Sequence, residues 1–146
     1  MPKEILIVDD EPDVLDTLED LLTMCMVTKA ATFEQAQKLL EDQYFDMAIL
    51  DIMGVHGYKL LEICNEKRVI GVMLTAYAMT PEDIKRSYES GAASFVPKEK
   101  MAEIIATPSK ALNPVDIYPD MLAHGFEKTS IALLNAMLED DGINGI

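Results

Sequence analysis

The sequence predicts an α/β fold: a doubly wound sheet of five parallel strands, followed by a C-terminal extension. Two observations support this fold class. Short apolar runs rich in β-branched residues recur between residues 4 and 97, without the polar alternation of strands that have one face in water. Segments between these runs carry apolar residues at helical spacing. This alternation of strands and helices favours a parallel sheet covered by helices on both faces.

The expected strands are runs of five or six residues. They cover residues 4–9, 26–31, 47–51, 69–74 and 93–97. The second run, MVTKAA, is a weaker strand candidate than the others. The others are of the kind found in strands that are buried on both faces.

Four helices are expected between the strands, over residues 12–24, 33–42, 58–67 and 81–90. Each of them has a plausible signal at one end or a clear apolar stripe. The start and stop signals are two prolines suited to a first turn, two threonines that can cap, and one glycine that can end a helix: Pro12, Pro81, Thr32, Thr80 and Gly91.

Composition limits the classes of function. The chain has 146 residues, 49% of them hydrophobic, which is enough for one domain with a real core. Its formal charge of -14 argues against nucleic-acid binding, which depends on clustered Lys and Arg. No stretch approaches the ~18 apolar residues of a membrane span, and the N-terminal run is too short for a signal peptide. We therefore expect a cytoplasmic protein without membrane insertion, in which Cys25 and Cys64 are reduced and buried.

Polar residues follow the expected strands. They are Asp9 and Asp10 after the first strand, Asp51 after the third, Thr75 after the fourth and Lys98 after the fifth. Ligands of open parallel sheets lie at the carboxyl ends of the strands, so all five should converge on one edge. Adjacent carboxylates repel one another unless a cation or donors hold the charge. The sequence therefore predicts a cation site there.

The residue types at this edge suggest phosphoryl transfer. Three carboxylates form a hard site of oxygen ligands that suits Mg²⁺. Asp51 could then attack a phosphoryl group, while Lys98 supplies positive charge and Thr75 donates a hydrogen bond to a phosphoryl oxygen. This arrangement predicts an aspartyl-phosphate site.

The motifs ILIVDDEPDV, AILDIM, VMLTA and SFVPK resemble those of the receiver domain of two-component response regulators. The resemblance covers residues 3 to about 106, and it implies the flavodoxin-like fold of receivers. We accordingly expect a receiver domain at residues 1–106 and an extension at 107–146. It further implies that the chain is no enzyme beyond its own phosphotransfer and dephosphorylation. The expected phosphodonor is a histidine kinase or a histidine phosphotransfer protein, and the downstream target is an unknown protein.

Individual roles also follow from the resemblance. It implies that Asp51 is the phosphoacceptor, that Asp10 binds Mg²⁺ directly and Asp9 through water, and that the Met53 main-chain carbonyl is a further ligand. Thr75 and Phe95 match the switch hydroxyl and the switch aromatic residue, and Lys98 matches the family's lysine. Met53 and Tyr77 occupy the two positions that govern the lifetime of the phosphoryl group.

The sequence departs from the family pattern in two loops. Family members usually have a proline after the phosphoacceptor, whereas DIMGVHGY has none and brings Gly57 only six residues after Asp51. The loop should therefore be about two residues shorter, and His56 within it either contacts the phosphoryl group or is simply exposed. In addition, Glu99 replaces the proline that usually follows the lysine, which favours a trans bond there.

Residues 107–146 contain no output domain that we can identify. The first part has three prolines and should form an irregular linker, and the second should form a short amphipathic helix with Ile131, Leu134 and Leu138 on one stripe. This helix either packs on the receiver or serves in interaction or homodimer formation. The segment has two Lys and six acidic residues and is too short for a winged helix, so we expect no DNA-binding output.

Three other functions remain open alongside the phosphorylated receiver. An adaptor of receiver shape could bind partners without phosphorylation. A phosphohydrolase that forms an aspartyl phosphate would usually have a second Asp two residues after its nucleophile on the first strand, where this chain has Glu11. A flavodoxin-like FMN protein would need a phosphate-binding loop of Gly, Ser and Thr after the first strand, where this chain has acids.

Overall fold

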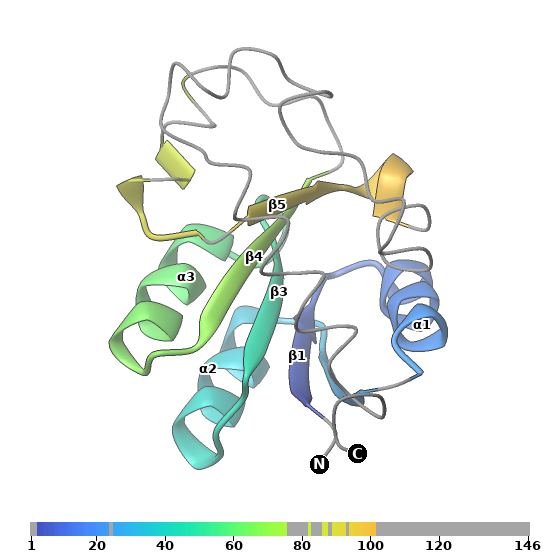
Figure 1. Cartoon of the computed structure of the whole chain (residues 1–146), viewed down its shortest axis with the longest axis horizontal. Helices are drawn as coiled ribbons and strands as arrows, with labels where there is room; N and C mark the ends of the chain where they lie inside the picture. Colours follow the sequence, from blue (N-terminus) through green and yellow to red (C-terminus); the bar gives the residue numbers. More distant parts are fainter. Residues whose placement is uncertain are drawn as a thin grey trace, which may run out of the picture.

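The computed structural model confirms a five-stranded parallel sheet in the order β2-β1-β3-β4-β5 (Figure 1). It describes residues 3–23, 25–75, 82, 86, 87, 89–92 and 94–101. The strands are β1 (Glu4–Val8), β2 (Met26–Ala30), β3 (Met47–Asp51), β4 (Ile70–Thr75) and β5 (Ser94–Pro97). The helices are α1 (Pro12–Leu21), α2 (Phe33–Asp42) and α3 (Gly57–Glu66), and a short 3₁₀ helix, η1 (Lys98–Lys100), follows β5. Every expected strand is present, with ends that differ by no more than one residue.

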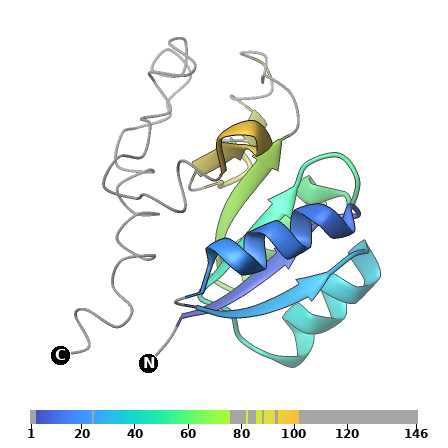
Figure 2. The same cartoon turned by 90° about the vertical axis from the view of Figure 1, so that its right-hand side faces the viewer.

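Helices cover both faces of the sheet. Helix α1 lies on one face, and α2 and α3 lie on the other (Figures 1 and 2). Alternate side chains of β1 face opposite sides of the sheet. Ile5 and Ile7 pack in the core on the α1 side, whereas Leu6 and Val8 pack in the core beneath α2 and α3. Both sets lose contact with water, which explains why these strands are apolar throughout.

The helix ends follow their sequence signals with one correction. Pro12 lies in the first turn of α1, and the Thr32 hydroxyl caps α2 by accepting a hydrogen bond from the Gln35 amide at 3.1 Å. Gly91 has a φ of 92°, a conformation that glycine adopts without strain. The prediction that the first helix extends to residue 24 is wrong, because α1 ends at Leu21 and the Leu22 amide bonds back to the Leu18 carbonyl.

Several predictions fall partly or wholly outside the described residues. Of the expected helix 81–90, residues 82, 86, 87, 89 and 90 are described; the first four are helical and residue 90 lies in a turn. Thr80, Pro81 and the whole segment 107–146 lie outside the described part, and so does its predicted amphipathic helix. Within the described residues, no helix is both long and apolar enough to cross a bilayer.

The two cysteines in the described part form no disulfide, as expected, but the expected burial holds for Cys64 and not for Cys25. Cys64 is fully buried, and burial raises the pKa of its thiol to about 12, so it stays protonated and unreactive at neutral pH. Cys25 is only partly buried.

The sheet order creates a crevice at the carboxyl ends of the strands. β1 lies between β2 and β3, so the chain leaves β1 toward one side of the sheet and later returns to its other side at β3. The ends of β1 and β3 are therefore neighbours, with Val8 opposite Leu50. Such a point is where open α/β sheets bind their ligands.

Candidate functional site

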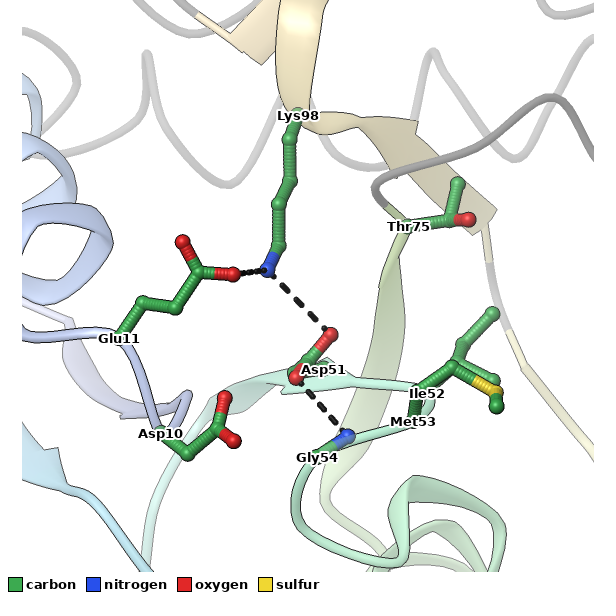
Figure 3. A pocket seen from close by; sticks show the side chains of 8 residues that line it. All are labelled: Asp10, Glu11, Asp51, Ile52, Met53, Gly54, Thr75 and Lys98. Atoms are coloured by element: carbon green, nitrogen blue, oxygen red, sulfur yellow. Dashed lines mark hydrogen bonds and ion pairs between the residues drawn. The ribbon is translucent and has the colours of Figure 1, made fainter.

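A cavity of about 210 Å³ lies at the carboxyl end of the sheet (Figure 3). Its lining comes from the segment after β1, the end of β3 with its following loop, the end of β4, and the residue after β5. The lining residues are Asp10, Glu11, Asp51, Ile52, Met53, Gly54, Thr75 and Lys98. Four of the five polar residues predicted to converge line this cavity, and the fifth, Asp9, reaches it through contact with Lys98.

Three carboxylates gather at this cavity. Asp9, Asp10 and Asp51 each offer an oxygen, and these atoms lie within 4.8 Å of one another. Asp9 is fully buried and Asp51 is 5% exposed, whereas Asp10 is exposed to solvent. Backbone amides donate to the two buried carboxylates: Glu11 N to Asp9 Oδ1 at 2.9 Å, and Gly54 N to Asp51 Oδ2 at 3.1 Å. The cluster is thus held in place by its own loops.

Lys98 supplies the positive charge at this cluster. Its Nζ lies 2.9 Å from Asp9 Oδ2, 3.3 Å from Glu11 Oε1 and 3.5 Å from Asp51 Oδ1. Burial lowers the pKa of this ammonium, but its contacts with the three carboxylates outweigh that effect and hold the pKa above its usual value. No peptide bond in the described residues is cis, so Lys98 reaches the site without the cis proline usual in the family.

The pKa of the Asp9 carboxyl is raised, mainly because the group is buried. Burial raises its pKa, contacts with Lys98 and the Glu11 amide lower it, and the charge of Asp51 raises it again, with a net rise above the ordinary value. Because the native pKa exceeds that of the unfolded chain, the protonated form stabilises the fold. That stabilisation is lost as the pH rises from about 4 through the native pKa. At neutral pH the ionised Asp9 carboxylate therefore weakens the folded state.

The cluster fits a hard divalent cation. Asp9 Oδ2 is buried, and the Lys98 ammonium pairs with it at 2.9 Å. A buried carboxylate oxygen is costly unless a positive charge lies beside it, and a divalent cation could take that place when the ammonium moves away. The ligand set consists of oxygens, which Mg²⁺ prefers.

Two glycines allow the short loop after Asp51 to fit. A side chain at Gly54 would collide with the carboxylate of Asp10, and one at Gly57 would collide with the main-chain carbonyl of Asp51. The loop therefore passes close to both acids, and α3 can begin at Gly57, directly beside the end of β3.

His56 is exposed and does not line the cavity. Its ring instead packs edge-on against Phe33, with ring centroids 5.9 Å apart. Of the two interpretations of His56 given above, the structure supports an exposed loop residue.

The remaining predicted site residues are placed in different ways. Thr75 ends β4 and lines the cavity, with its hydroxyl turned away from Asp51 (Figure 3). Met53 lies at the rim and is 80% exposed. The backbone of Phe95 lies in β5 opposite Met73, but its side chain lies outside the described part, as does Tyr77.

Sequence reasoning missed two functional contacts at this site. Glu11 binds Lys98, and Gly54 donates its amide hydrogen to Asp51. Glu11 stands next to the acidic pair, so the run of three acids was a signal that a second carboxylate could share the lysine. Nothing in the sequence around Gly54 identified its amide as the donor.

Comparisons with known proteins agree with this geometry. The family model of the response regulator receiver domain matches residues 5–107. The two-component response regulator ARR18 of Arabidopsis thaliana is 33% identical over 100 residues, which are 64% of this chain and 16% of that protein. The chain spans 16% to 44% of the length of the curated relatives it matches.

Solved structures show the same fold. The BeF3-activated receiver domain of DrrB, from Thermotoga maritima, has a TM-score of 0.66 and 25% identity, with 75% of this chain and 96% of that chain covered. The response regulator TrrA of the same organism, solved with Mg²⁺ and BeF, has a TM-score of 0.61 and 31% identity, with 75% and 99% covered.

Proposed function

The chain belongs to the response regulator receiver family, and from this premise we propose that Asp51 accepts a phosphoryl group from a phosphohistidine and that the modified domain then signals through another protein. Receiver domains act in two-component phosphorelays with histidine kinases, and they are not conventional enzymes. A histidine kinase or histidine phosphotransfer protein is thus the proposed donor. A cytoplasmic location would give the domain access to such a donor.

One observation supports this proposal above the others. Asp51 lines the cavity beside two other carboxylates and a lysine, so an incoming phosphoryl group would meet a nucleophile, a positive charge and a metal-ligand set together. In the reaction, an Asp51 carboxylate oxygen forms the new P–O bond while the P–N bond to the donor histidine breaks. The electron pair of that bond returns to the imidazole.

The residues of the site have separate tasks in this proposal. Asp9, Asp10, Asp51 and the Met53 carbonyl would hold Mg²⁺, which neutralises charge on the phosphoryl oxygens when bound. Lys98 would leave its carboxylate partners to bind another phosphoryl oxygen. Thr75 would turn its hydroxyl inward and donate a hydrogen bond to a third.

Incubation with a small phosphodonor such as acetyl phosphate tests the proposal. In the presence of Mg²⁺, the mass of the intact protein should rise by one phosphoryl group, and a chelator should prevent this gain. A protein that stays unmodified with Mg²⁺ present would rule out the phosphoacceptor function and leave the adaptor that acts without phosphorylation.

We expect a rotation of the Thr75 side chain to alter the structure of the neighbouring strand, β5. Thr75 pairs with Pro97 across β4 and β5, and Phe95 lies two residues earlier on the same strand. We propose that inward rotation of Thr75 vacates space for Phe95, which reshapes the surface beside β5 and creates the binding face for the downstream protein.

Beryllofluoride, a phosphoryl mimic, should therefore shift amide NMR signals across residues 75–105 in the presence of Mg²⁺. A Thr75→Val variant keeps the shape of the side chain without its hydroxyl, so its shifts should be fewer beyond β4. Wild-type shifts confined to residues 52–57 would show that the change does not travel by this route.

A further inference from the structure

Lys98 divides its ion pairs between two kinds of carboxylate. Asp9 and Asp51 belong to the three-carboxylate group that can hold a metal ion, whereas Glu11 does not. Glu11 Oε1 lies 3.3 Å from Lys98 Nζ and accepts a hydrogen bond from it. Figure 3 shows Glu11 reaching the ammonium from the α1 side, above Asp51.

A bound cation would affect the contacts of Lys98 with Asp9 and Asp51, but not its contact with Glu11, in the same way. An ion held by Asp9 and Asp51 would share these carboxylates with the ammonium of Lys98, and the two positive charges would repel each other at short range. Lys98 must therefore move away from both aspartates when the metal site fills. Glu11 is the one partner among the three that this movement leaves available.

Glu11 can keep its contact with Lys98 when the ammonium moves. Its backbone is fixed, because the Glu11 amide donates to Asp9 Oδ1 at 2.9 Å. Its side chain is 62% exposed, compared with 13% for that of Lys98, so the carboxylate can follow the ammonium toward the mouth of the cavity. Asp9 is fully buried and has no comparable freedom.

We propose that Glu11 is a positioning residue that takes over Lys98 when a divalent cation occupies the carboxylate group, and that it holds the ammonium at the cavity mouth until a phosphoryl group arrives. This inference rests on the proposed function, because it assigns Glu11 a task in the same reaction. Without Glu11, Lys98 keeps only Asp9 and Asp51 as carboxylate partners among the described residues, and it then competes more strongly with the metal.

A Glu11→Gln variant should bind Mg²⁺ about two- to fivefold more weakly than wild type, the range expected for one partly exposed ion pair. Titration with MgCl₂, followed by the amide NMR signal of Gly54, measures this because that amide donates to Asp51. The matched control is Asp13→Asn, which removes one charge from an exposed acid in the first turn of α1. It should lower the affinity by a clearly smaller factor.

A Lys98→Met background separates the effect of the contact between Glu11 and Lys98 from the effect of removing a negative charge at residue 11. In this background Glu11→Gln should lower the affinity no more than Asp13→Asn does, because there is no ammonium left to hand over. The inference is overturned if Glu11→Gln matches Asp13→Asn in the wild-type background, or if its effect is equally large without Lys98. Failure of the wild-type protein to bind Mg²⁺ would instead contradict the proposed function itself.

Discussion

The double variant Asp10→Ala, Asp51→Ala should accept no phosphoryl group, and its melting temperature should not respond to Mg²⁺. Asp51 supplies the proposed nucleophile, and the two substitutions together remove two of the three carboxylates within 4.8 Å of one another. In the wild-type protein an ion that binds only the folded state stabilises it by mass action, by about 1.4 kcal/mol at ten times its dissociation constant. For a domain of about 100 residues or somewhat more, that corresponds to a rise of about 5–7 °C.

The same variant should melt at a higher temperature than wild type when Mg²⁺ is absent and the pH is neutral. Burial is the main cause of the raised pKa of Asp9, and the charge of Asp51 raises that pKa further by repulsion. Removal of Asp51 relieves that repulsion, and Lys98 can still pair with Asp9 at 2.9 Å.

Scanning calorimetry with and without MgCl₂ measures both effects. The control is Asp13→Ala, Asp20→Ala, which removes two exposed acids of α1 outside the cluster and should keep the full response to Mg²⁺. Equal Mg²⁺ responses in the two double variants would contradict the assignment of the metal site.

A Met53→Asn, Tyr77→Glu variant should lose its phosphoryl group about tenfold faster than wild type, which corresponds to about 1.4 kcal/mol of transition-state stabilisation. Met53 lies at the rim of the cavity, next to the Asp51 loop, and has no polar group to orient an attacking water. Tyr77 lies outside the described residues, and its role comes from the family resemblance. An amide and a carboxylate at these positions could align water for attack on phosphorus.

The time course of phosphate release from the modified protein, after removal of the phosphodonor, measures this rate. Met26→Asn, Tyr44→Glu is a matched control, because it makes the same chemical changes at two exposed residues that do not line the cavity. If the test variant is no faster than this control, the side chains at 53 and 77 do not set the lifetime. The short loop after Asp51 would then be the next candidate.

Local sequence signals were enough for most of the fold. The apolar runs at residues 4–9 and 47–51 correspond to β1 and β3, and Thr32 caps α2 as its position suggested. These features depend on neighbours within a few residues along the chain, so periodicity and capping chemistry reveal them. The end of α1 was predicted three residues too late, because Leu22 is buried like a helical residue although the helix has already ended.

The residues of the candidate site could be predicted from the sequence, but their geometry could not. Parallel strands end at one edge of the sheet, so Asp9, Asp10 and Asp51 had to meet once the strands were placed. The sequence did not predict the distances between these carboxylates, their different burial or the raised pKa of Asp9. These properties depend on how the loops cover each carboxylate.

The sequence by itself determined the alternation of strands and helices, and with it the chemistry that gathers at one end of the sheet. Only the tertiary structure decided which side chains and backbone groups of the site contact one another. Glu11 and Lys98 are 87 positions apart, yet their side chains meet 3.3 Å from each other, and the Gly54 amide faces Asp51 because the loop between β3 and α3 is tightly folded. The contact between Glu11 and Lys98 depends on the packing of segments that are distant along the chain, and no local pattern in the sequence encodes the distance between them.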